Sequence, residues 1–194
     1  LINAVITLLL GFGVTFVLVF FQNLNGDEDG EEKNQIAEQA DVRIAAPISG
    51  TVKPVTECED EVFASEALGK GVVIEPEEGK VYAPCDGEIS AFFETKHAIG
   101  ITATNGMELL IHVGMNTVTL NGEGFTPHAE AGDKIKKGQL LLEFDIDFIR
   151  SKGLPVSTPV VIANLDEGQE ISCRLGAVKK GEALMSFSNG QEEK

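Results

Sequence analysis

Two of the three histidines flank a short turn and could act together in chemistry. Asn-Gly at 105–106, the strongest two-residue turn signal, separates two apolar segments. A two-residue turn would place His112 opposite Ile99 and make His97 its diagonal neighbour on the same face of a hairpin. A four-residue loop keeps this register, whereas a three-residue loop would reverse the parity and separate the two side chains. We therefore predict neighbouring imidazoles, on the condition that the loop has an even length.

Two neutral imidazoles on one face suit phosphoryl transfer. One ring nitrogen can attack while the neighbouring ring donates a hydrogen bond to the oxygens of the group in transit. Thr95 lies two residues before His97, so its hydroxyl could fix the tautomer of that ring. A lone histidine in an apolar strand is more often an ordinary buried residue, but two on one face favour a site. The same pair could also bind zinc.

The overall charge limits the partners of the chain. Its 194 residues contain 31 acidic and 15 basic side chains, which gives a formal net charge of −16. Such a surface repels the phosphates of nucleic acids and of anionic lipids. Cys58, Cys85 and Cys173 lie far apart and form no metal-binding spacing, so we interpret them as reduced cytosolic thiols. Nucleic acid is therefore excluded as an expected partner.

The chain divides into three parts by composition. Residues 1–21 are uncharged and apolar and would span about 30 Å as a helix, so we predict a transmembrane helix at the end of a truncated membrane domain. Residues 22–40 form an acidic, solvated linker. From 41 to 194, short apolar runs alternate with turn residues, which predicts an all-β domain, an antiparallel β-sandwich or barrel. One short helix is expected over 146–152.

Two pairs of similar segments indicate related turns inside this β domain. Ala-Pro-Ile-Ser-Gly-Thr-Val at 46–52 resembles Ala-Pro-Cys-Asp-Gly-Glu-Ile at 83–89, and Lys-Lys-Gly occurs at both 136–138 and 179–181. Proline and glycine bracket a turn between extended segments in the first pair. Two copies are too few for a solenoid, so we interpret them as equivalent corners of one domain, although chance similarity is the alternative.

The histidine segments resemble a known family. Glu-Leu-Leu-Ile-His-Val-Gly-Met-Asn-Thr-Val at 108–118 is similar to the active-site motif of the glucose-type enzyme IIA domains of the bacterial sugar phosphotransferase system. Phe-Glu-Thr-Lys-His at 93–97 resembles the segment that carries their second histidine. The likeness covers nearly all of residues 41–188, and the spacing of the two histidines agrees with the family.

The resemblance implies a β-sandwich that relays a phosphoryl group and needs neither a cofactor nor a metal. The phosphocarrier protein HPr would phosphorylate His112 at Nε2, and an enzyme IIB domain would take the group and pass it to the sugar. His97 would support the transfer and Thr95 would bond to His97. Gly114 matches a glycine that lets the partner or the phosphate approach. The resemblance also implies a partner-binding rim made of Val62, Phe63, Leu68, Phe93 and Leu110, with Asp60 and Asp166 as flanking acids.

The order of segments favours one type of parent protein. A membrane helix that leads through a linker directly into the IIA domain resembles the IIB-IIC-IIA permeases for β-glucosides, sucrose or trehalose. This order implies attachment to a IIC membrane domain, with the IIA domain in the cytoplasm. The sugar depends on the IIC domain and is not predicted. Asn116 departs from the aspartate of many relatives, and His128 has no counterpart in the motifs, so we expect it on the surface.

Two other functions compete with this interpretation. A zinc metallohydrolase of a related β fold could use His97 and His112 as ligands, but it needs a third protein ligand and none is evident nearby. A biotinyl or lipoyl carrier is suggested by residues 131–139, yet no Met-Lys pair marks a modified lysine there. A regulatory relative without catalysis would have lost one of the histidines, and both are present.

Overall fold

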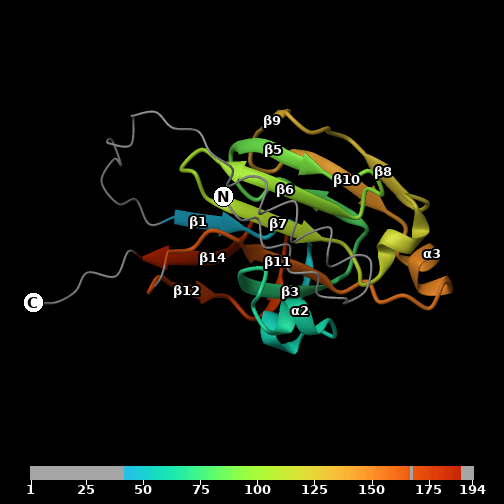
Figure 1. Cartoon of the computed structure of the whole chain (residues 1–194), viewed down its shortest axis with the longest axis horizontal. Helices are drawn as coiled ribbons and strands as arrows, with labels where there is room; N and C mark the ends of the chain where they lie inside the picture. Colours follow the sequence, from blue (N-terminus) through green and yellow to red (C-terminus); the bar gives the residue numbers. More distant parts are fainter. Residues whose placement is uncertain (1–41, 167, 189–194) are drawn as a thin grey trace, which may run out of the picture. The chain divides into compact units, whose positions relative to one another are not determined.

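The computed structural model describes residues 42–166 and 168–188 (Figure 1). The predicted membrane helix, 1–21, and the predicted linker, 22–40, lie outside this part of the chain. Within the part that is described, no helix is long and apolar enough to cross a membrane. The strands that are present all pair in antiparallel fashion, as the sequence predicts.

The largest element is an eight-stranded sheet whose central strands carry the site (Figure 1). Its strands are rich in valine, isoleucine and threonine, which fit the pleated surface of a sheet. In spatial order they are β13 (Gly176–Val178), β2 (Gly50–Pro54), β3 (Lys70–Pro76), β11 (Thr158–Ile162), β7 (Glu108–His112), β6 (Ala98–Ala103), β5 (Gly87–Phe92) and β9 (Lys134–Ile135).

Two three-stranded sheets complete the β-structure. The first consists of β1 (Val42–Ala45), β14 (Ala183–Ser188) and β12 (Glu170–Cys173), and the second of β4 (Lys80–Tyr82), β10 (Leu140–Phe144) and β8 (Phe125–Pro127). Four single-turn or short helical segments connect the strands: η1 (Val55–Glu57), α2 (Glu61–Ala64), η2 (Thr117–Leu120) and α3 (Ile146–Ser151). The helix predicted over 146–152 is therefore confirmed as α3, and Asp145 caps it by accepting a hydrogen bond from the Phe148 N–H at 2.9 Å.

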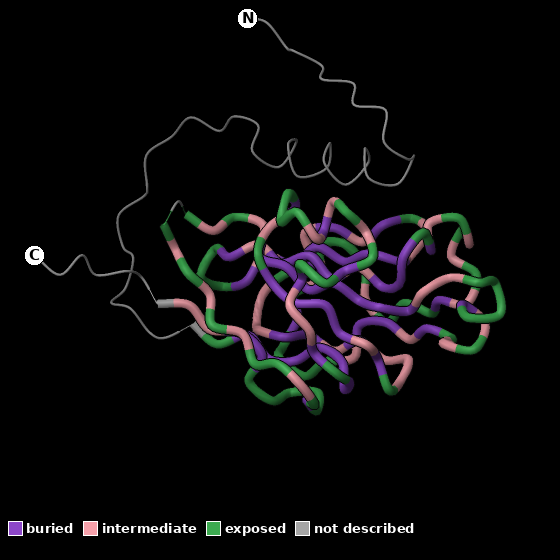
Figure 2. The backbone as a smooth tube through the Cα atoms, turned by 90° about the horizontal axis from the view of Figure 1, so that it is seen from below, coloured by how far each residue is buried: buried purple, intermediate pink, exposed green. Residues whose placement is uncertain are grey.

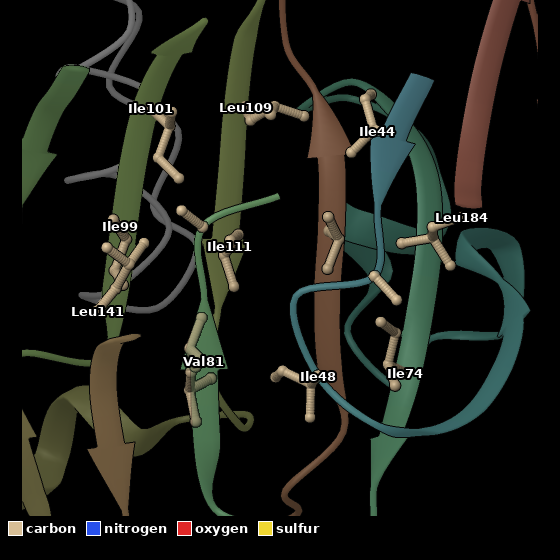
Figure 3. Packing of buried hydrophobic residues seen from close by; sticks show 14 of the residues in the cluster. Ile44, Ile48, Ile74, Val81, Ile99, Ile101, Leu109, Ile111, Leu141 and Leu184 are labelled. Carbon is tan, nitrogen blue, oxygen red and sulfur yellow. The ribbon is translucent and has the colours of Figure 1, made fainter. Parts of the chain in front are cut away.

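The core lies between the eight-stranded sheet and the two smaller sheets. Side chains of β6 and β7 meet side chains of β4 and β10 on one side, and those of β3 meet β1 and β14 on the other (Figure 3). The inner stretches of the strands are buried and the turns between them are exposed (Figure 2). Because each buried aliphatic side chain contributes about 1.5–3 kcal/mol, this sandwich holds the central strands β6 and β7 firmly in place.

The sheets have an internal two-fold order. From its two edges inward, the eight-stranded sheet presents equivalent strands: β13, β2, β3 and β11 correspond to β9, β5, β6 and β7. The two smaller sheets correspond to each other in the same way. The similar turns of the sequence occupy equivalent places in this arrangement. Gly181 donates its N–H to the carbonyl of Ala46 at 2.9 Å, and Gly138 donates to that of Ala83 at 2.8 Å.

The two proline-containing corners also bond to each other reciprocally. The N–H of Ala45 donates to the carbonyl of Pro84 at 3.0 Å, and the N–H of Tyr82 donates to the carbonyl of Pro47 at 2.8 Å. These positions are equivalent when the two similar segments are superposed on their Ala-Pro pairs. The interpretation of the echoes as equivalent corners of one domain is confirmed.

Candidate active site

The hairpin between β6 and β7 has a three-residue loop. Ala103 donates its N–H to the carbonyl of Met107 at 2.8 Å, and Gly106 donates to the carbonyl of Ala103 at 2.9 Å. Residues 104–106 therefore form the loop, with Gly106 at its third position and a φ of +83°. A turn followed by a left-handed residue is a standard three-residue connection. The predicted two-residue turn is wrong by one residue.

The two imidazoles nevertheless meet, by a different route from the predicted one. His112 lies opposite Ala98 rather than Ile99. His97 precedes β6 and follows Lys96, whose φ is +59°, so its side chain is not bound by the alternation of the strand. The centroids of the two rings are 4.8 Å apart with an angle of 81° between their planes. The prediction of neighbouring rings is confirmed, and the parity condition attached to it is wrong.

His97 is a buried, neutral imidazole held by Thr95. Thr95 Oγ1 lies 2.7 Å from His97 Nδ1, as the sequence predicted for this hydroxyl. The ring of Phe93 packs against the His97 ring at 5.6 Å. Burial first, and then the proximity of His112, lower the pKa of His97 to about 3. The ring is therefore uncharged at neutral pH and its two nitrogens have different roles.

The hydrogen bond of His112 selects the nitrogen that can react. Its Nδ1 lies 2.8 Å from the carbonyl oxygen of Gly114, and because a carbonyl only accepts, Nδ1 carries the proton. Nε2 is therefore the unprotonated nitrogen with a free lone pair. Burial lowers the pKa of His112 to about 4, against the opposite influence of the Gly114 carbonyl and of Asp60. A neutral imidazole with a free Nε2 can act as a nucleophile.

Gly114 is required by the packing of its own segment. Its φ is +71°, and a Cβ atom there would lie 2.6 Å from Thr117 Cγ2 and 2.7 Å from the carbonyl oxygen of Pro155. The sequence-based expectation was that this glycine lets a partner or a phosphate approach. The structure gives a different reason, because the space of the missing Cβ is already occupied by the protein itself.

The aromatic members of the predicted rim contact the site. The ring of Phe63, on α2, lies 5.3 Å from the His112 ring, and Phe93 contacts His97 as described above. Asp60 caps α2, since its carboxylate accepts hydrogen bonds from the N–H groups of Val62 at 2.9 Å and Phe63 at 3.4 Å. Asp60 thereby places the helix that carries Phe63, which is drawn beside β3 in Figure 1.

Most of the predicted rim is buried. Leu110 has no exposed surface, and Phe63, Leu68 and Phe93 are 4 %, 6 % and 7 % exposed, so in this structure all four are buried residues. Val62 is half-buried. The strand β11 runs from the His112 end of the sheet toward the hairpin end, and Asp166 lies in the exposed loop that follows it. The N–H of Asp166 donates to Gln169 Oε1 at 2.9 Å. Asp166 is therefore not brought into the immediate surroundings of the histidines.

Two residues of the site were not predicted. Thr117 has no exposed surface, and its hydroxyl donates to the carbonyl of Val113 at 2.6 Å. The carbonyl of Pro155 accepts the N–H of Met115 at 3.1 Å. Thr117 lies five residues after His112 in the sequence, and this proximity was the one signal that could have pointed to it. Pro155 comes from a distant loop and acts through its backbone, so no residue type marks it.

Metal chemistry finds no support in the described residues. Within residues 42–166 and 168–188, no group of three or more His, Cys, Asp or Glu side chains could hold a metal ion. All three cysteines are free, and burial raises the pKa of Cys85 to about 11. His128 lies at the surface, as expected, where its Nε2 is 2.8 Å from Glu143 Oε2. The zinc-enzyme alternative therefore gains nothing from the structure.

Comparison with known proteins identifies one family. Residues 42–168 match the family model described as phosphoenolpyruvate-dependent sugar phosphotransferase system, EIIA 1. A glucose-specific EIIA component from Bacillus cereus is 49 % identical over 139 residues, which are 71 % of this chain and 84 % of the relative. The glucose permease IIA from Mycoplasma capricolum matches in structure with a TM-score of 0.73 and 30 % identity, over 79 % of this chain and 99 % of that one.

A longer relative carries a similar segment as one part of its chain. The beta-glucoside-specific EIIBCA component of Bacillus subtilis is 42 % identical over 161 residues, which are 82 % of this chain. Those residues are 26 % of that relative, so this chain spans about a quarter of its length.

Proposed function

The chain belongs to the EIIA 1 family of the phosphoenolpyruvate-dependent sugar phosphotransferase system, and we propose that His112 is the residue that carries its phosphoryl group. Its family function is phosphoryl transfer in sugar uptake, which makes it a transferase component. The observation that carries the assignment of His112 is its hydrogen bond to Gly114, which leaves Nε2 free. His97 lacks such a bond to a carbonyl and is more deeply buried, with 3 % of its surface exposed.

Transfer at His112 needs no proton to leave the ring. When Nε2 attacks the phosphorus of the phosphorylated donor HPr, a nitrogen–phosphorus bond forms and the bond to the donor breaks. The proton on Nδ1 stays where it is, and the positive charge that develops on the ring is shared with the Gly114 carbonyl at 2.8 Å. Attack by an enzyme IIB domain on the same phosphorus then releases His112 in its starting form.

His97 supports the transfer from the neighbouring position. If the Thr95 hydroxyl donates to Nδ1, at 2.7 Å, the proton of His97 resides on Nε2 and can be donated to a phosphoryl oxygen. The low pKa of about 3 keeps the His97 ring neutral. It would therefore stabilise the negative charge of the phosphoryl oxygens by hydrogen bonding and not as a cation. Thr95 is in this scheme a positioning residue.

Partner docking is proposed on the side of Phe63. HPr and the IIB domain must bring their reactive groups to Nε2 of His112, and the Phe63 ring lies beside that imidazole. Val62 is half-buried on the same helix, and Asp60 supplies a negative charge at its start. The buried Leu68 and Leu110 would support this surface from beneath. Asp166 would be a more distant acidic residue outside it.

We further propose that the domain is tied to a membrane permease. Residues 1–21 would cross the membrane, 22–40 would be the linker and 41–194 the IIA domain in the cytoplasm, in a IIB-IIC-IIA order. The match to a beta-glucoside-specific EIIBCA component supports this order, while a glucose-specific EIICBA component of Staphylococcus saprophyticus, 44 % identical over 143 residues, represents the other order. The sugar is set elsewhere in such a permease.

The proposal is tested by phosphorylating the full chain. The chain is incubated with phosphoenolpyruvate, enzyme I and HPr, and intact mass is measured at neutral pH, where phosphohistidine survives. We expect one acid-labile phosphoryl group that is absent from His112→Ala. His97→Gln should still accept the group but pass it more slowly to a IIB domain. A phosphoryl group that persists in His112→Ala would overturn the assignment.

A further inference from the structure

The carbonyl that orients His112 belongs to a peptide unit fixed on both sides. The peptide between Gly114 and Met115 points its oxygen at His112 Nδ1, at 2.8 Å, and its N–H at the carbonyl of Pro155, at 3.1 Å. A peptide unit is planar, so a bond to its N–H also fixes the direction of its oxygen. The loop between α3 and β11, which contains Pro155, thus fixes the N–H side of this peptide unit.

Thr117 fixes the preceding peptide unit. Its Oγ1 donates to the carbonyl of Val113 at 2.6 Å, and its side chain has no exposed surface. Its Cγ2 methyl fills the space beside Gly114, where it would lie 2.6 Å from an added Cβ. The hydroxyl holds one peptide plane and the methyl group supports the left-handed residue between the two planes. The position of the Gly114 carbonyl is therefore determined jointly by Thr117 and Pro155.

We infer that Thr117 is a positioning residue of the phosphoryl-accepting site: its hydroxyl, through Val113 and Gly114, keeps the proton of His112 on Nδ1 and leaves Nε2 free to react. This inference rests on the proposed role of His112. Thr117 touches neither ring nitrogen, so it acts through the backbone. Without its hydroxyl, the Val113–Gly114 peptide loses one anchor, and the Gly114 oxygen, which is then held only through the Met115–Pro155 bond, opposes Nδ1 at hydrogen-bonding distance for less of the time.

The chain offers matched substitutions for a test. Thr117→Val keeps the shape of the side chain and removes the hydroxyl. Thr119→Val makes the same change in the same short segment, η2, where Thr119 Oγ1 bonds to the Asn116 carbonyl at 2.7 Å and does not hold the peptides around Gly114. If Thr117→Val does not fold, Thr117→Ser and Thr117→Ala provide a second pair, since both lose the methyl group and only the serine keeps a hydroxyl.

The measurement is the tautomer of His112 in the unphosphorylated full chain, taken from the nitrogen resonances of ¹⁵N-histidine-labelled protein. We expect the Nδ1–H to Nε2–H ratio to fall about fivefold in Thr117→Val, the effect of losing roughly one hydrogen bond. The serine variant and Thr119→Val should keep the wild-type ratio. An unchanged ratio in a folded Thr117→Val, or in Thr117→Ala, would overturn the inference.

A second measurement, of phosphorylation kinetics, separates this inference from the proposed function. The rate of phosphorylation by HPr should fall in Thr117→Val in proportion to the measured loss of the Nδ1–H tautomer, with the KM for HPr unchanged, because docking does not involve Thr117. If the wild-type chain is not phosphorylated at all, the proposed function fails, whereas the tautomer measurement still decides the role of Thr117. A raised KM with an unchanged maximal rate would assign Thr117 to docking and contradict the inference.

Discussion

Replacing His97 by glutamine should make the protein less sensitive to acid. His97 is 3 % exposed, and burial, followed by the nearby His112, lowers its pKa from 6.5 to about 3. In the unfolded chain the ring regains an ordinary pKa near 6.5. As the pH falls below that value, the unfolded state binds a proton that the folded state does not, so the free energy of unfolding decreases until the pH reaches about 3.

The size of the effect follows from the two pKa values. Between about pH 7.5 and about pH 5, the unfolded state gains roughly 2 kcal/mol of proton binding at His97 while the folded state gains almost none. Glutamine does not titrate and loses this contribution. The stability of the wild type relative to His97→Gln should therefore fall by about 2 kcal/mol over this range, and the carboxylates common to both proteins cancel in the difference.

Urea unfolding followed by far-ultraviolet circular dichroism provides the assay, at both pH values and for both proteins. His128→Gln is the matched control, because it removes a surface histidine by the same substitution. A stability difference between wild type and His97→Gln that does not change with pH would refute the reasoning. It would mean that the folded protein accommodates a charged ring at this position.

Other changes test the segments around the histidines. Gly114→Ala should lower the free energy of unfolding by about 1–3 kcal/mol, measured by urea titration, because the new Cβ meets Thr117 and the Pro155 carbonyl in a left-handed conformation. Asp60→Ala should cost about 1 kcal/mol of stability through loss of the α2 cap, whereas Asp60→Asn should keep most of it; equal losses would exclude capping as the cause. Cys85, whose pKa is raised to about 11 by burial and the nearby Asp86, should react with iodoacetamide at neutral pH far more slowly in the folded than in the urea-unfolded chain, as followed by mass.

The sequence was sufficient for the pairing of the histidines and insufficient for the register that produces it. Asn-Gly at 105–106 suits a two-residue turn, but a glycine with positive φ also suits the third position of a three-residue loop. The difference depends on one hydrogen bond, from Ala103 to Met107, which residue types do not specify. The outcome was preserved because His97 lies outside the strand, where alternation no longer applies.

Residue types also could not separate the rim of the site from the core. The strand β7 is central in its sheet, and Leu109, Leu110 and Ile111 all have no exposed surface. When a strand is covered on both faces, alternation of polar and apolar residues disappears, and an apolar residue beside His112 looks the same whether it supports the site or binds a partner. The short helix α3 was predictable, because the helical spacing of Ile146, Ile149 and Arg150 marks it locally and Gly153 and Pro155 mark its end.

The two-fold order of the sheets leaves the two histidines in one of two equivalent halves. When the paired residues of β3 and β11 are superposed on those of β6 and β7, Val161 takes the place of His112 and Lys70 takes the place of His97. Val161 has no exposed surface and Lys70 is exposed, so the second half offers neither a nucleophile nor a neutral donor. The second half therefore repeats the framework of strands without the reactive side chains. If His112 carries the phosphoryl group, as proposed, these equivalent positions accommodate a single group per domain.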